Sequence, residues 1–335
     1  MAIDYSHASD SDSCEQLSGP TKQDMAMMRI AIAGTSGLAR LIAHYINQQT
    51  SHHVVFLSRR PQPELKQRFQ VAVVDYNDME TLQYALRGID TVISTVTGTN
   101  QIELIKAAVS ARVRRFAPAE FEGLPQLRAS DDPLDRHRTS ALQWLAYYAQ
   151  NIQSTVFICG ILYERFQPGG LAALRIGRGS GIDREGDYIM NCRTMTATVP
   201  CYDENLNPTA TVCMTAAQDV ARFVTKAIDM PQWPPEMRMC GHRIGVKDLV
   251  ILAQRLRGVM FNPITWHNSE SLRTELQLAI TQQDDEQQTR LSALISTAEG
   301  HYDYQHADLN QRFPDLRPIP FPDWFVAKWR STPGS

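Results

Sequence analysis

The feature that most constrains this chain is an apolar run that ends in a glycine turn and continues as an amphipathic helix. Residues 27–33 (MMRIAIA) are mostly apolar, residues 34–37 read GTSG, and apolar residues then recur at helical spacing through residues 38–46. The pattern predicts a buried strand, a tight turn and a helix. Free N–H groups at the start of such a helix can bind a diphosphate, with Gly34 allowing the turn and Gly37 a close backbone approach. A dinucleotide is therefore the first ligand to expect.

Two features bear on the choice between this ligand and a plain tight connection. Arg40 stands at the third position of the usual fingerprint, where a small residue is expected, and this favours a plain connection. The second apolar run, residues 53–57, is followed by Ser58, Arg59 and Arg60, where a dinucleotide fold meets the adenosine ribose. A carboxylate there would bind the 2′-hydroxyl of NAD, whereas arginine pairs with the 2′-phosphate of NADP. Arg59 and Arg60 therefore favour NADP. The alternative interpretation is that they are two solvated arginines at a strand end.

Strand and helix patterns alternate from residue 27 to residue 160. Further strands are predicted at 70–75, 91–96, 115–118 and 153–159, and helices at 79–87, 101–111 and 136–150. Continuous apolar strands separated by amphipathic helices are typical of a parallel sheet covered on both faces. The expected fold class is therefore α/β, a Rossmann-type parallel sheet with a smaller C-terminal substrate lobe.

Three segments are expected along the chain. Residues 1–26 are polar and are predicted to be a disordered tail. Residues 27–160 are expected to form the NADP-binding Rossmann domain, and residues 161–335 the substrate lobe, with some segments returning to the Rossmann core. In the lobe, short strands are predicted at 188–192, 196–202, 211–214 and 238–242, and one long polar helix at 269–298.

Ligands of a parallel sheet bind at the carboxyl ends of its strands. At those ends the sequence places turn residues, hydroxyl groups and charged side chains from five loops. The candidate cofactor-binding residues are Gly34, Thr35, Ser36, Gly37, Leu38, Ser58, Arg59, Arg60, Asp75, Ser94, Thr95, Val96 and Pro118.

Composition argues against several classes of partner. The chain has 33 basic and 36 acidic residues and a net charge of −3, so it lacks the footprint of a nucleic-acid or acidic-membrane binder. No apolar run approaches the roughly 20 residues that span a bilayer, and the N-terminus does not read as a signal sequence. Six cysteines without metal-ligand spacing are typical of free thiols in a reducing compartment. We expect a cytoplasmic monomer or homodimer with a small-molecule substrate and no metal, nucleic acid or membrane.

The sequence resembles the NmrA-like and isoflavone-reductase-like family of atypical short-chain dehydrogenases over most of residues 28–329. Residues 114–121 (RRFAPAEF), similar to the family's RFxPSEF signature, carry the resemblance most specifically, with support from residues 34–37, 58–60, 88–96, 160–166 and 219–223. The resemblance implies NADP(H) on the Rossmann domain and substrate in a cleft roofed by the lobe. Family members include reductases of phenylpropanoid-type compounds, enzymes of fungal secondary metabolism, and catalytically silent redox sensors that bind transcription factors.

The chain departs from the family's reductases where their acid–base chemistry lies. The lysine that the resemblance implies on the helix after residues 118–121 falls at Thr139 or Ser140, neither of which can hold a cationic proton donor. Residues 134–149 contain no lysine, no YxxxK arrangement is present, and Ala119 replaces the signature serine. The chain therefore lacks the residue for the usual lysine-assisted reduction.

Three residues are candidates for that acid–base chemistry. Glu120 follows Pro118 at a strand end, where burial would raise its pKa so that it could donate a proton; the alternative is a structural carboxylate that pairs with an arginine. His137 could transfer protons near neutral pH, with Arg138 as an oxyanion stabiliser, or both could belong to a solvated helix start. Tyr163 could hydrogen-bond the substrate or be a buried structural tyrosine.

Taken together, the residues and the resemblance predict an NADP(H)-binding enzyme that acts on a small aromatic or heterocyclic secondary metabolite. Two mechanisms stay open. The first is hydride transfer with a substitute proton donor such as Glu120 or His137. The second is a non-redox isomerisation or rearrangement in which Glu120 supplies the proton. The alternative from another class is a catalytically silent NADP redox sensor that regulates a protein partner.

Overall fold

Six short strands form one parallel sheet in the computed structural model, which describes residues 27–129, 132–203 and 207–330. The expected disordered tail, residues 1–26, lies outside these ranges. The order across the sheet is β3-β2-β1-β4-β5-β6, and every neighbouring pair is parallel. This order confirms the predicted Rossmann-type α/β fold, whose crevice opens between β1 and β4. The strands are β1 (Arg29–Ala33), β2 (His53–Ser58), β3 (Gln70–Val73), β4 (Thr91–Ser94), β5 (Arg115–Ala117) and β6 (Gln153–Ser154).

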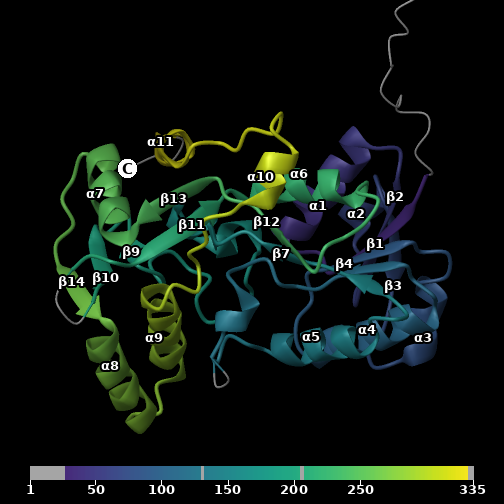
Figure 1. Cartoon of the computed structure of the whole chain (residues 1–335), viewed down its shortest axis with the longest axis horizontal. Helices are drawn as coiled ribbons and strands as arrows, with labels where there is room; N and C mark the ends of the chain where they lie inside the picture. Colours follow the sequence, from purple (N-terminus) through teal and green to yellow (C-terminus); the bar gives the residue numbers. More distant parts are fainter. Residues whose placement is uncertain (1–26, 130–131, 204–206, 331–335) are drawn as a thin grey trace, which may run out of the picture.

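Helices cover both faces of this sheet (Figure 1). Alternate residues of β1 point to opposite faces: Ile30 and Ile32 join one buried apolar cluster, and Ala31 and Ala33 join another. Both faces of the strand are therefore buried, which is why its sequence is a continuous apolar run. One face is covered by α1 (Gly37–Gln49) and α6 (Ala217–Ile228), the other by α3 (Met79–Ala85), α4 (Thr99–Ser110) and α5 (Arg138–Tyr147), and α2 (Pro63–Lys66) follows β2.

A second group of smaller sheets and helices lies beside the carboxyl edge of the large sheet (Figure 1). Its pairings are β14-β10-β9, β13-β11-β8 and β12-β7. No helix in the described ranges is long and apolar enough to cross a membrane. The strands are β7 (Val156–Ile158), β8 (Ile161–Leu162), β9 (Met190–Asn191), β10 (Thr196–Tyr202), β11 (Thr211–Thr215), β12 (Glu236–Arg238), β13 (His242–Gly245) and β14 (Ile264–Asn268), and the helices are α7 (Val246–Arg257), α8 (Ser269–Thr281), α9 (Asp285–Ala298), α10 (Asp308–Arg312) and α11 (Phe321–Arg330).

Three element predictions in this region are wrong. The single helix expected at 269–298 is the pair α8 and α9, because Gln283 adopts a left-handed conformation (φ 56°) and Asp284 caps α9 by accepting from the N–H of Gln287. The strand expected at 238–242 is the end of β12, a turn at residues 239–241 and the start of β13. The strand expected at 153–159 is divided, since β6 pairs with β5 whereas β7 pairs with β12.

Candidate functional site

The glycine turn between β1 and α1 is held in contact with the end of β4, on the other side of the crevice of the sheet. Gly34 has φ +96°, and a Cβ there would lie 2.5 Å from the hydroxyl oxygen of Thr95 at the end of β4. Both the backbone N–H and the hydroxyl of Thr95 donate to the Ala33 carbonyl at 2.9 Å. Ser36 caps α1 by accepting from the N–H of Ala39 at 3.3 Å. The turn therefore presents the start of α1 at the crevice, where an anion can bind.

Gly37 is required for a contact that the sequence does not reveal. A Cβ at Gly37 would lie 2.0 Å from the carbonyl oxygen of Leu174, in a 3-10 turn at Leu171–Leu174. The backbone approach expected at this glycine is therefore made by another part of the chain. Residues 171–174 cover the start of α1, and the segment that follows them continues along the crevice.

The residues after β2 leave two guanidinium groups free to bind an anion. Arg59 and Arg60 are exposed and make no ion pair with any residue in the described ranges. Ser58 shapes their loop, since its hydroxyl donates to the Arg60 carbonyl at 2.8 Å. Arg40, which stands in place of the third small residue, donates from Nε to the Thr35 carbonyl at 3.1 Å and pairs with Glu64 at 2.9 Å. Arg40 thus braces the turn from its outer side.

The other predicted cofactor residues lie at the same edge. Ser94 and Val96 are joined by two hydrogen bonds through the Ser94 hydroxyl, at 3.1 and 3.2 Å. Asp75 accepts from the N–H of Asn77 at 2.9 Å, so its carboxylate orders the turn after β3. The Pro118 carbonyl accepts from the N–H of Glu120 at 2.8 Å. These bonds fix the loops, and cofactor binding by their residues stays a prediction.

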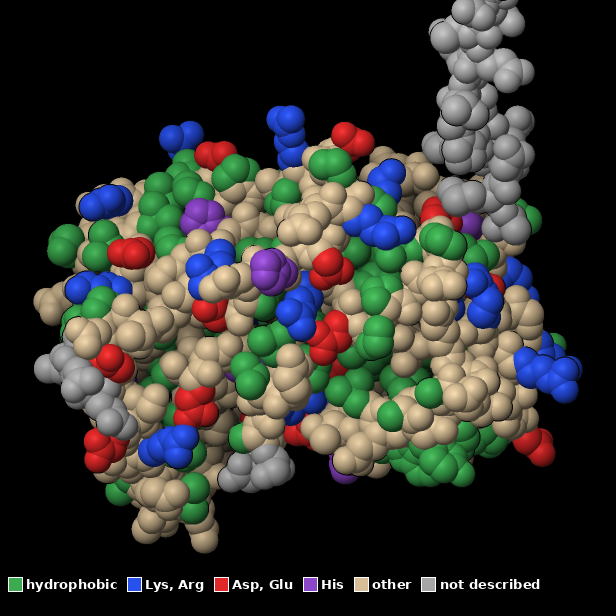
Figure 2. All heavy atoms as spheres, viewed as in Figure 1, with side chains coloured by type: hydrophobic (Ala, Val, Ile, Leu, Met, Phe, Trp, Pro, Cys, Tyr) green, Lys and Arg blue, Asp and Glu red, His purple; other side chains and the backbone are tan. Residues whose placement is uncertain are grey.

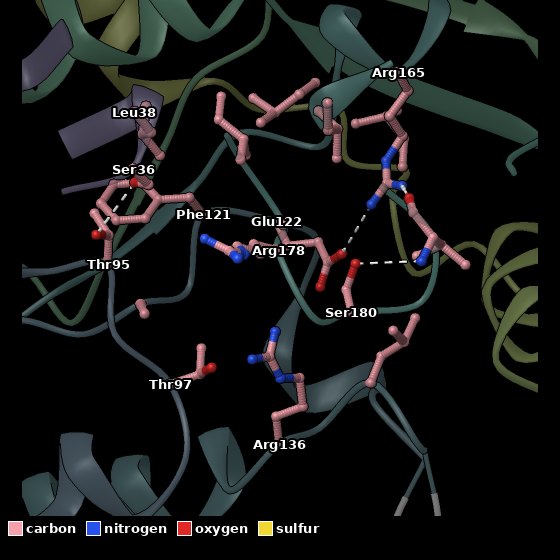
Figure 3. Close-up of a pocket in the computed structure, with 18 of the residues that line it drawn as sticks. Ser36, Leu38, Thr95, Thr97, Phe121, Glu122, Arg136, Arg165, Arg178 and Ser180 are labelled. Atoms are coloured by element: carbon pink, nitrogen blue, oxygen red, sulfur yellow. Dashed lines mark hydrogen bonds and ion pairs between the residues drawn. The ribbon is translucent and has the colours of Figure 1, made fainter. Parts of the chain in front are cut away.

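A cavity of about 250 Å³ extends from the glycine turn to the segment at residues 160–182 (Figure 3). Ser36, Leu38 and Thr95 belong both to the predicted cofactor site and to the wall of this cavity. Figure 2 shows Lys and Arg side chains next to Asp and Glu side chains in the middle of the face that it draws. The cavity wall is part hydroxyl, part apolar and part basic. Its other polar and charged residues are Thr97, Glu122, Arg136, Arg138, Arg165, Arg175, Arg178 and Ser180, and its apolar ones include Phe121, Leu134, Ile161, Leu162, Ile176 and Ile182.

A buried ion network lies against one wall of the cavity. Glu122 pairs with Arg138 at 2.7 Å and with Arg165 at 3.8 Å. Burial opposes ionisation of Glu122, but these two arginines lower its pKa to about 2, so it is a carboxylate at neutral pH. Glu120, 1% exposed, is paired with Arg128 and lies 3.8 Å from Arg138, and burial raises its pKa. Arg138 is thus held between two carboxylates.

The three predicted catalytic residues are not brought together. Glu120 does not line the cavity. It lies 3.8 Å from Arg138, which does. His137 precedes α5 in a left-handed conformation (φ 62°), is exposed and does not line the cavity. Tyr163 is fully buried, donates to the Ile319 carbonyl at 3.2 Å and also stays outside the cavity. Catalytic roles for these residues stay predictions.

Residues that the sequence did not single out supply much of the cavity's charge. Glu122 directly follows residues 114–121 and Arg165 lies within residues 160–166, whereas Arg175 and Arg178 come from a glycine-bearing stretch without regular periodicity. The only available signal for the last two was the basic, glycine-rich run at residues 175–181 (RIGRGSG). Within the described ranges, no group of three or more His, Cys, Asp and Glu side chains is arranged to hold a metal ion.

Comparisons with known proteins agree with this arrangement. A family model described as NAD(P)H-binding matches residues 33–155. The chain is 27% identical to "Oxidoreductase BOA1" of Botryotinia fuckeliana, over 69% of this chain and 77% of that protein. Among solved structures, the pinoresinol-lariciresinol and phenylcoumaran benzylic ether reductases match with a TM-score of 0.69 at 15% identity, over 91% of this chain and 100% of theirs. "AtPrR2 with NADP+ and (+)pinoresinol" matches with a TM-score of 0.67 at 16% identity, over 90% and 99%.

The matched family region begins at the last residue of β1 and ends just after β6, so it contains the glycine turn, the arginine pair and the end of β4. The structural matches extend over the lobe as well. At such low identity these matches show the fold, and the family model shows the ligand class. The chain therefore carries an NAD(P)H-binding domain and has the fold of the isoflavone-reductase-like proteins.

Proposed function

We propose that this protein is an NADP(H)-dependent oxidoreductase that transfers hydride to a small aromatic or heterocyclic compound of secondary metabolism. The observation that carries the proposal is that the cavity begins at the glycine turn. Ser36 in the turn donates a hydrogen bond to Thr95, and both residues also line the cavity. A dinucleotide laid along the turn would place its far end in a chamber that also has room for part of a substrate. The curated relative named an oxidoreductase supports the same reaction class.

The residues at the crevice fit NADP(H). The start of α1 and the backbone of residues 34–37 would hold the diphosphate, because a helix N-terminus attracts anions. Arg59 and Arg60 would hold the 2′-phosphate, because they are exposed cations without a partner in the described ranges and a guanidinium pairs with phosphate through two N–H groups. When bound, NADPH supplies a hydride.

The chain's own part in such a reaction would be electrostatic. Arg138 lines the cavity, and Glu122 and Glu120 hold its guanidinium in place and keep its pKa high against the effect of burial. A fixed guanidinium can donate hydrogen bonds to an oxygen on which negative charge develops as a carbonyl is reduced, and water would then give that oxygen its proton. Glu122, ionised beside it, is no proton donor at neutral pH.

This arrangement favours hydride transfer over the non-redox rearrangement. The rearrangement needs Glu120 to give a proton directly to the substrate, but Glu120 is 1% exposed and lies behind Arg128 and Arg138. A positioning role for Glu120, exerted through Arg138, agrees better with these contacts. In that role Glu120→Gln would lower kcat more than it changes KM, and the affinity for NADP+ would stay the same.

The reaction class is tested with NADPH carrying deuterium at C4 and a panel of aromatic and heterocyclic ketones and imines. We expect deuterium in the product and equimolar NADP+. Product formed without consumption of NADPH would refute hydride transfer in favour of rearrangement. Tight NADPH binding with no turnover of any panel member would favour the redox-sensor alternative.

The cofactor assignment is tested separately by binding. Arg59→Ala is expected to weaken NADP+ by about tenfold or more, the cost of a charge-assisted hydrogen-bond pair, and to leave NAD+ binding nearly unchanged. Arg255→Ala, an exposed arginine on α7 at the opposite end of the molecule, is the matched control. Equal losses for the two dinucleotides would contradict the phosphate contact.

A further inference from the structure

The cavity has more positive charge than its own carboxylate can balance. Five arginines line it, and Glu122 is the one carboxylate among the described residues of its wall. Glu122 pairs with Arg138 and Arg165. The remaining three arginines, at positions 136, 175 and 178, make no ion pair with any residue in the described ranges. Arg136, Arg175 and Arg178 are exposed to solvent, so they cost little without a partner, but three unpaired positive charges around one cavity attract an anion.

Arg175 lies on the cofactor side of the cavity. It follows Leu174, whose carbonyl abuts Gly37 at the start of α1. It also faces Glu64 after β2: the hydrogen bond from Arg40 lowers the pKa of Glu64, and the charge of Arg175 adds to that effect. Arg175 would therefore pair with the diphosphate of the dinucleotide, and it is not counted among the residues that bind the substrate.

Arg136 and Arg178 are exposed residues that line the same cavity, and both side chains point into it (Figure 3). The backbone of Arg136 is anchored, since its carbonyl accepts from the N–H of Gly98 at 2.9 Å. Its Nη2 lies 4.0 Å from the position of a Cβ on Gly179, next to Arg178. Arg136 therefore comes from the segment before α5, Arg178 comes from the segment after Leu174, and the two segments lie close together at the cavity.

The wall beside this pair is apolar. Phe121, Leu134 and Ile161 line it, and Phe121 stacks on Phe157 with ring centroids 5.9 Å apart, which fixes its ring. A ligand that satisfies both surfaces has a flat or apolar body and one negatively charged end. A neutral body alone would leave both guanidinium groups without a counter-ion.

We propose that Arg136 and Arg178 form a carboxylate subsite, so that the substrate is an organic acid with an apolar, ring-bearing body. The inference rests on the proposed function for the place of the cofactor. A guanidinium group gives paired N–H donors to a carboxylate, so the two side chains together would hold the acid group and orient the substrate. The carboxylate then anchors the substrate while its reducible group lies toward the glycine turn.

The subsite is tested by calorimetric titration of the full chain with benzoate and with benzamide, its uncharged counterpart. Titrations are made on wild type and on Arg136→Gln, Arg178→Gln and Arg184→Gln, with saturating NADP+ and without it. Arg184 is the matched control, because it is an exposed arginine in the same stretch of chain as Arg178 but does not line the cavity. Thermal melts show whether each variant is folded.

We expect benzoate to bind wild type at least about tenfold more tightly than benzamide, and each of the two cavity variants to lose that preference. Arg184→Gln should keep it, and NADP+ affinity should change less than twofold in all variants. Benzoate binding no tighter than benzamide, or unchanged in both cavity variants, would overturn the proposal.

Two further outcomes separate this inference from the cofactor assignment. If Arg136→Gln and Arg178→Gln weaken NADP+ as much as benzoate, the arginines hold the cofactor diphosphate and the carboxylate subsite is refuted. If wild type binds no NADP+, the proposed function fails, while the titrations without cofactor still decide whether the pair binds a carboxylate.

Discussion

Glu164 gives this fold a measurable dependence of stability on pH. It lies in the turn Tyr163–Phe166 directly after β8, is 3% exposed, and accepts from the backbone N–H of Ala217 at the start of α6 at 3.0 and 3.1 Å. Burial raises its pKa to about 7, although the hydrogen bond from the helix start acts to lower it. The protonated form is therefore favoured in the folded protein over a wide pH range.

The sign and size of the effect follow from this pKa. Because the folded pKa lies above the unfolded value of 4.5, the contribution of Glu164 to stability is complete below pH 4.5 and is lost as the pH rises through 7. From about pH 5 to about pH 8 the loss in the free energy of unfolding is about 2.5 kcal/mol. Glu164→Gln keeps an oxygen that can accept from Ala217 but removes the titration.

The assay is urea unfolding of wild type and Glu164→Gln at several pH values in that range. The free energy of unfolding of the variant, relative to wild type, should rise by about 2.5 kcal/mol between about pH 5 and about pH 8. Glu270→Gln, an exposed carboxylate in the first turn of α8, is the control and should show no such trend. A difference between wild type and Glu164→Gln that stays constant across the range would refute the reasoning.

Three other substitutions test contacts that hold the site in place. Gly37→Ala puts a Cβ 2.0 Å from the Leu174 carbonyl and should cost about 1–3 kcal/mol of stability, seen as a lower unfolding midpoint; an unchanged midpoint would contradict the close contact. Tyr163→Phe loses the bond to the Ile319 carbonyl and should cost about 1 kcal/mol with turnover preserved, whereas a loss of turnover in a stable variant would restore its catalytic role. Arg115→Met leaves the buried carbonyl of Ile228 and the part-buried carbonyl of Pro231 without the guanidinium that donates to them and should cost about 1–3 kcal/mol in urea unfolding; an unchanged free energy of unfolding would refute this role.

The sequence by itself determined the Rossmann sheet and the ligand class. A strand that is buried on both faces has a continuous apolar sequence, such as residues 30–33. The turn is also recognisable from the local sequence, because Gly34 adopts a φ that other residues rarely take. Because the carboxyl ends of parallel strands share one edge, the sequence alone predicts that the loops after β1, β2 and β4 lie close together. Periodicity and turn chemistry act over a few residues, which is why they can be read from a sequence.

Only the tertiary structure decided what lines the cavity. Arg136 precedes α5, while Arg175 and Arg178 lie on an irregular stretch some forty residues later, and no periodic pattern relates them. Glu120, the proton donor expected from its place in the motif, is removed from the cavity by Arg128 and Arg138, partners that become neighbours only through folding. Whether a charged side chain meets a ligand or a counter-ion depends on contacts between distant segments, and local sequence carries no record of them.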